Sequence, residues 1–125
     1  MINQQQTGPL TFGQGPLSIE DIVAIAKGHT QAKLSNDTGF TQRIDAGVAF
    51  LDKLLAEDGV IYGVTTGYGD SVTRAVPLSL VNELPLHLTR FHGCGLGDVF
   101  SKEQGRAILA TRLNSLAQGY SGVSW

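Results

Sequence analysis

Four segments of the chain carry apolar residues at helical spacing, and residues typical of helix ends bound them. These segments are residues 18–28, 36–59, 77–91 and 101–119. The first opens on Ser18, whose hydroxyl can cap a helix, with Asp21 three residues later. The last opens on Ser101, and Gln104 at the third helical position predicts a capping box. The pattern predicts a mainly α protein.

Residues that break helices predict what lies between these segments. Pro85 falls inside the third apolar segment and must kink or split that helix, because proline lacks a backbone donor. Leu10–Phe12 is predicted to be a short edge strand, and residues 31–35 a short extended piece. Residues 60–64 are predicted to be a short strand or an extended lead into a loop, and Gly67, Gly69 and Asp70 are predicted to end regular structure there. The 125 residues suit one domain, and no linker divides them.

Composition excludes several classes of partner. The net charge is −2 and no run of basic residues occurs, which argues against nucleic acid. No stretch reaches the roughly 20 apolar residues of a membrane helix. The three histidines lack a cluster of cysteines or carboxylates, so we expect no metal site. Cys94 is the only cysteine, which fits a reducing, cytoplasmic location.

The segment from Tyr62 to Gly69 concentrates glycine, threonine and tyrosine. Glycines permit tight turns, and threonine hydroxyls can bond back to the backbone, so such a loop can fix a phenol in place. Spacing alone favours a plain glycine-rich turn over a catalytic loop. The loop is no dinucleotide-binding motif, because a third glycine at the required offset is missing. The cluster Gly93–Gly97 lacks the lysine of a phosphate-binding loop and is expected to join two helices.

Three segments taken together resemble one enzyme family. Residues 60–69 closely resemble the tyrosine loop of the histidine, phenylalanine and tyrosine ammonia-lyases. Residues 88–97 resemble that family's substrate-selectivity helix and the turn after it, and residues 112–122 its helix end before the cofactor segment. Residues 17–28 resemble its first helix, so the resemblance covers nearly the whole chain. It is closest to the histidine ammonia-lyase-like bacterial members.

The resemblance implies a fold, a cofactor and an assembly. It implies the N-terminal part, residues 1–125, of a mostly helical enzyme with the aspartase/fumarase-like fold, with a few short strands. Family members form the electrophile methylidene-imidazolone (MIO) from an internal Ala-Ser-Gly, and this sequence contains no Ala-Ser-Gly. The cofactor-bearing remainder is therefore expected to be absent from this chain, and the chain alone to be inactive. The family also implies a homotetramer.

The same resemblance assigns roles by position. Tyr62 is expected to be the base that removes a β-proton of the substrate, and Gly69 to shape the loop near the substrate. His92 and Phe91 are expected to lie against the substrate side chain. Thr65 matches phenylalanine lyases better than histidine lyases, whereas His92 matches histidine lyases and some tyrosine lyases. Because a site built around a hydrogen bond rejects substrates lacking it, we rank histidine and tyrosine above phenylalanine.

Three interpretations remain open. The first is an MIO-dependent ammonia-lyase that converts histidine or tyrosine to urocanate or coumarate. The second is a non-catalytic helical module derived from a lyase, which binds a partner or ligand. The third is an aminomutase of the same family, which shares these motifs.

Overall fold

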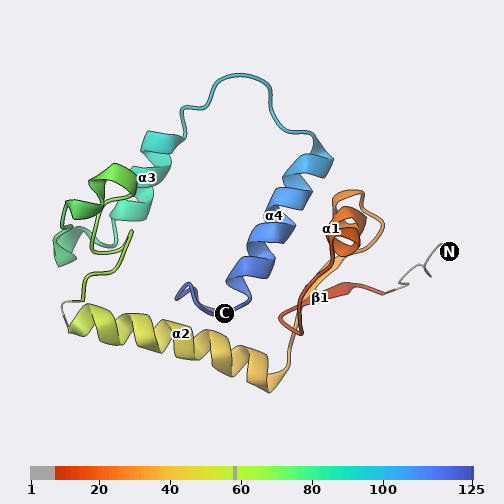
Figure 1. Ribbon diagram of the computed structural model, residues 1–125, viewed down its shortest axis with the longest axis horizontal. Helices are drawn as coiled ribbons and strands as arrows, with labels where there is room; N and C mark the ends of the chain where they lie inside the picture. The colour runs from red at the N-terminus through yellow and green to blue at the C-terminus, as the bar shows by residue number, and fades with distance from the viewer. Residues whose placement is uncertain (1–7, 58) are drawn as a thin grey trace. The chain divides into compact units, whose positions relative to one another are not determined.

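The computed structural model describes residues 8–57 and 59–125, and Figure 1 shows their elements. In chain order these are β1 (Leu10–Phe12), α1 (Ile19–Ala26), β2 (Ala32–Leu34), α2 (Thr38–Ala56), the 3-10 helices η1 (Gly69–Thr73) and η2 (Leu78–Leu80), α3 (Leu84–His92) and α4 (Lys102–Leu116). The mainly α prediction is confirmed. By its internal contacts the chain divides into two compact units, Met1–Phe50 with Val99–Trp125, and Leu51–Asp98.

The first unit contains the core of the described residues. β1 and β2 form a parallel pair in which Leu10 lies opposite Ala32 and Phe12 opposite Leu34. Phe12 is fully buried, and Phe40 and Ile44 from α2 pack in the same cluster. The other buried members are Leu10, Ile25, Ala110 and Ala117. Helices α1 and α4 also pack together, so residues from both ends of the sequence close one core.

The capping box predicted at Ser101 is present, and Ser18, predicted as a helix start, forms one as well. The Asp21 N–H donates to Ser18 Oγ at 3.1 Å, and the Ser18 N–H donates to Asp21 Oδ2 at 2.9 Å. At the start of α4, the Gln104 N–H donates to Ser101 Oγ at 3.2 Å and the Ser101 N–H to Gln104 Oε1 at 2.9 Å. These bonds satisfy N–H groups that a helix start leaves without partners, which fixes where each helix begins.

The second unit, Leu51–Asp98, differs from the sequence expectation in two places. Residues 60–64 do not form the short strand that was one of their two expected forms: Tyr62–Thr65 are a turn, in which the N–H groups of Val64 and Thr65 both donate to the carbonyl of Ile61. Regular structure also does not end at Gly67, since η1 begins at Gly69. Pro85 splits the third apolar segment as predicted, and it stands at the start of α3, where a missing N–H costs no helical bond.

Among the described residues, no helix is long and apolar enough to cross a membrane. Over the same residues, no group of three His, Cys, Asp or Glu side chains gathers as metal ligands would.

Candidate active site

Two threonine hydroxyls hold the loop that carries Tyr62. Thr65 Oγ1 accepts the Ile61 N–H at 2.8 Å and donates to the Gly59 carbonyl at 3.0 Å. Thr66, which is buried, accepts the Gly63 N–H at 3.1 Å and donates to the Gly67 carbonyl at 2.9 Å. Each hydroxyl therefore ties two backbone groups of a loop that has no sheet or helix partners for them.

The far side of the loop is anchored by a short antiparallel bridge. Thr66 pairs with Ala75, the Gly67 N–H donates to the Arg74 carbonyl at 3.0 Å, and the Val76 N–H donates to the Thr65 carbonyl at 2.9 Å. The bridge closes the chain around η1. The loop is thus bonded along its length, and of its side chains Tyr62 is exposed while Thr66 is buried.

The phenol of Tyr62 is exposed but held at its oxygen. Its side chain is 63% exposed, and its hydroxyl oxygen accepts the Gly69 N–H at 3.0 Å. Gly69 has a φ of +55°, a left-handed conformation that favours glycine. The two residues that the family resemblance assigned to this loop therefore form one hydrogen-bonded unit, in which a backbone N–H points at the phenolic oxygen.

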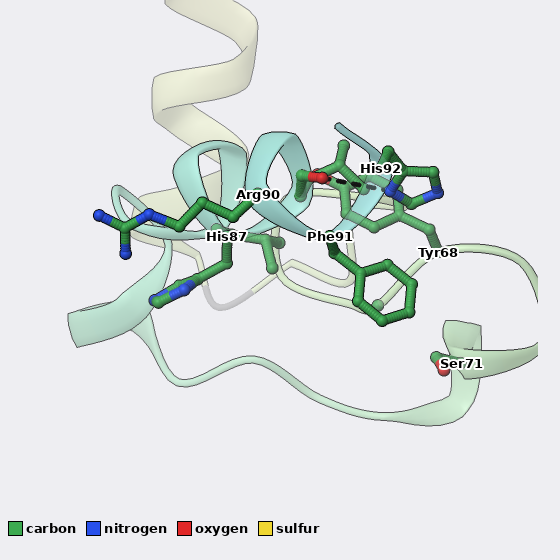
Figure 2. A pocket seen from close by; sticks show the side chains of 9 residues that line it. Tyr68, Ser71, His87, Arg90, Phe91 and His92 are labelled. Carbon is green, nitrogen blue, oxygen red and sulfur yellow. Dashed lines mark hydrogen bonds between the residues drawn. The ribbon is translucent and has the colours of Figure 1, made fainter. Parts of the chain in front are cut away.

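An open, largely apolar pocket of about 580 Å³ lies between the η1 region and α3 (Figure 2). Its lining residues are Gly67, Tyr68, Ser71, Leu84, His87, Leu88, Arg90, Phe91 and His92. The two selectivity residues expected from the family resemblance, Phe91 and His92, both line it. His87 and Arg90 extend from α3 away from His92 in this view (Figure 2). The pocket can therefore hold an aromatic ring with polar groups at its edges.

One ring nitrogen of His92 is already engaged. Its Nδ1 lies 3.2 Å from the Leu88 carbonyl oxygen, which can only accept, so Nδ1 is the donor of this contact (Figure 2). In the tautomer that carries its proton on Nδ1, Nε2 is an acceptor. The Phe91 ring packs edge-on against His92, with centroids 5.3 Å apart, and is itself 81% exposed. The pair thus offers one apolar face and one hydrogen-bond acceptor.

Tyr68 is one of the pocket residues that sequence reasoning did not single out. Its ring lines the pocket and also meets the ring of Tyr62 edge-on, with centroids 6.3 Å apart. Ser71 and His87 line the pocket as well and were not expected there. In the sequence, the only feature that could have pointed to Tyr68 is its place between Gly67 and Gly69. The folded loop shows that its ring contacts Tyr62 and lines the pocket.

The helical fold, the bonded tyrosine loop and the pocket that contains Phe91 and His92 agree with the family resemblance seen in the sequence. The chain belongs to the aromatic amino acid lyase family, whose sequence model matches residues 17–125. The family resemblance seen in the sequence is thereby confirmed.

The chain is similar in sequence and in structure to individual proteins of known name. The chain is 39% identical over 108 residues to histidine ammonia-lyase of Bos taurus, covering 86% of this chain and 16% of the relative. It is 40% identical over 107 residues to histidine ammonia-lyase of Gloeobacter violaceus, covering 86% and 20%. Its structure is similar to that of tyrosine aminomutase from Streptomyces globisporus, with a TM-score of 0.81 and 30% identity over 92% of this chain and 22% of the other. The chain thus spans only about a sixth to a fifth of the length of these curated relatives.

Proposed function

We propose that this chain supplies the base-carrying loop of an aromatic amino acid ammonia-lyase, which eliminates ammonia from histidine or tyrosine to give urocanate or coumarate. The observation that carries the proposal is the exposed Tyr62 phenol, held by the Gly69 N–H beside the loop end that lines an aromatic pocket. An oriented N–H stabilises negative charge on the oxygen it faces, which suits an oxygen that must accept a proton. In the proposal, Tyr62 removes the β-proton of the substrate.

The proposal includes the cofactor MIO, formed from an Ala-Ser-Gly that lies outside this chain. The residues present fit such a group. The loop provides a base, and the loop and α3 together provide a pocket for the substrate ring, whereas unmodified side chains offer no strong electrophile. MIO would supply the electrophilic activation that makes a weakly acidic β-proton removable. What this chain contributes is the base, its orientation and the pocket that positions the ring.

The geometry of His92 supports the choice of substrate class. With Nδ1 donating to the Leu88 carbonyl, Nε2 can accept the phenolic O–H of tyrosine or the imidazole N–H of histidine. Phenylalanine offers no such donor, and an acceptor that the bound substrate covers without pairing it costs about 1–3 kcal/mol. We therefore propose histidine or tyrosine ahead of phenylalanine.

The direct test uses the complete gene product that carries this chain. Tyr62→Phe should lower turnover of histidine or tyrosine by about 10²- to 10⁴-fold, because it removes the proton acceptor while keeping the ring. Tyr120→Phe is the matched control, since Tyr120 is 92% exposed and is not part of the loop or pocket. Product formation is followed by the absorbance of the arylacrylate.

Two results would contradict the proposal. One is full turnover by Tyr62→Phe. The other is a gene that encodes no Ala-Ser-Gly downstream of residue 125, which would favour a non-catalytic helical module instead.

An aminomutase is the second candidate, favoured by the similarity to the tyrosine aminomutase structure. Both reactions begin with loss of the β-proton, so both need the Tyr62 loop. Chromatography of the products separates them, because an aminomutase returns a β-amino acid, whereas a lyase releases ammonia and the arylacrylate.

We further propose that the complete protein is a cytoplasmic homotetramer, as the family resemblance implies. Exposed apolar side chains such as Val60, Leu96 and Val99 support an assembly that covers them. The single, free Cys94 suits a reducing compartment.

A further inference from the structure

We propose that Tyr68 is a positioning residue for Tyr62, an inference that rests on the proposed function. Its ring holds the phenol of Tyr62 in the orientation from which the β-proton is removed. The two rings meet at an interplanar angle of 89° with centroids 6.3 Å apart, which is the edge-to-face arrangement that aromatic pairs favour.

Tyr68 is itself fixed by the backbone of the loop. A Cβ built on Gly63 would lie only 2.7 Å from the Tyr68 ring, so the ring packs where only a hydrogen atom fits. Gly63 also has a φ of +70°, a conformation that side chains rarely adopt. A ring wedged against Gly63 has little freedom to turn, and it can therefore act as a firm support for its neighbour.

Tyr62 needs such a support because little else restrains its side chain. It is 63% exposed, and the hydrogen bond from the Gly69 N–H holds only the far end of the ring. This single bond is exposed to solvent, and when it opens the side chain can swing about χ1 and carry the oxygen away. The edge contact with Tyr68 restricts that movement. Displacing a reacting group by about 1 Å can cost a factor of 10² in rate, so this restriction matters to catalysis.

The ring of Tyr68, rather than its hydroxyl, performs this role. Within residues 8–57 and 59–125, no hydrogen bond involves the Tyr68 hydroxyl. The same ring also lines the pocket that contains Phe91 and His92. Tyr68 therefore places the base next to the space where the substrate ring would lie.

The test compares Tyr68→Phe with Tyr68→Leu in the complete gene product. Tyr68→Phe keeps the ring and should retain kcat within about twofold. Tyr68→Leu removes the ring and should lower kcat by about 10- to 100-fold, more than it changes KM. With a substrate deuterated at the β-carbon, the kinetic isotope effect on kcat should rise in Tyr68→Leu, because proton removal becomes the slower step. A Tyr68→Leu enzyme with unchanged kcat and a raised KM would reduce Tyr68 to a wall of the pocket and overturn the proposal.

A double-mutant cycle separates positioning from a general structural effect. In a Tyr62→Phe background there is no base left to position, so adding Tyr68→Leu should lower the residual turnover no further. A second loss as large as the first would show that Tyr68 acts independently of Tyr62, and the inference would fail.

A third variant, Gly63→Ala, tests the inference independently in case Tyr68→Leu folds poorly. Gly63→Ala keeps the Tyr68 ring but pushes it, and should reproduce the fall in kcat and the larger isotope effect. Gly97→Ala is the matched control, since Gly97 also has a positive φ, +104°, yet a Cβ there meets nothing within 4 Å. Equal kcat in the two variants would contradict the inference. An inactive parent protein would overturn the proposed function, whereas an active parent that needs Tyr62 but tolerates Tyr68→Leu would overturn only the role of Tyr68.

Discussion

At the scale of single residues, His92 is where the proposed substrate preference can be read directly. Replacing it by Phe removes the Nε2 acceptor that remains when Nδ1 bonds to the Leu88 carbonyl. In the complete gene product, kcat/KM for histidine or tyrosine should fall by about 5- to 150-fold, the equivalent of losing about 1–3 kcal/mol. For phenylalanine it should hold or rise. The three substrates are compared in one absorbance assay.

The matched variants for this residue are His92→Gln and His29→Phe. Glutamine keeps an oxygen that can accept a hydrogen bond, so His92→Gln should keep part of the preference for donor-bearing substrates. His29 follows α1 and is not among the residues that line the pocket. An unchanged ratio of tyrosine to phenylalanine turnover in His92→Phe would show that this side chain does not select the substrate.

At the scale of elements, one face of α2 determines how closely the turn after α4 can approach. A Cβ on Gly47 would overlap the carbonyl oxygen of Gly119. One turn earlier on α2, the Arg43 guanidinium donates to the Ala117 carbonyl at 3.5 Å. Gly47→Leu should therefore destabilise the protein by roughly 1–3 kcal/mol through overpacking, measured as a lower midpoint of thermal unfolding. Gly105→Leu in α4, where a Cβ meets nothing within 4 Å, should be neutral or stabilise by up to about 1 kcal/mol.

The elements also show which parts of the fold a sequence can reveal. Helix starts were predictable at Ser18 and Ser101 because a capping box is made by residues three apart. The split at Pro85 followed from its missing N–H. A glycine-rich turn was predictable between Tyr62 and Gly69, but its exact place at residues 62–65 was not, because it depends on where the Thr65 and Thr66 hydroxyls find partners.

The candidate site also has residues that the sequence predicts and contacts that only the structure shows. Tyr62, Gly69, Phe91 and His92 were named because a family resemblance assigned them by position, and the structure shows Gly69 bonded to Tyr62 and the other two in one pocket. The contact of Tyr68 with Tyr62 depends on the shape of the whole loop, and no local spacing rule encodes it. Pairwise contacts across a loop are therefore the part of a site that most needs coordinates.

At the scale of the whole molecule, the two compact units differ in how much they bury. The buried apolar cluster, including Phe12, Phe40 and Ile44, belongs to the first unit. Among the described residues of the second unit, Thr66 alone is buried. Two large apolar residues of the second unit, Phe91 and Leu96, are 81% and 102% exposed. Hydrophobic burial is the main force that stabilises a fold, so the first unit should be the more stable one.

Hydrogen exchange on the isolated 125-residue chain tests this difference. Amides of α1 and α4, which pack on the buried cluster, should exchange at least about tenfold more slowly than those of residues 59–98. The Tyr62 loop should exchange fast in the isolated chain because few buried apolar contacts hold its unit together. In the complete gene product the same loop should become protected, since the proposed assembly covers its exposed apolar side chains. Equal protection of both units in the isolated chain would show that residues 59–98 are stable without further partners, and the expected need for an assembly would be wrong.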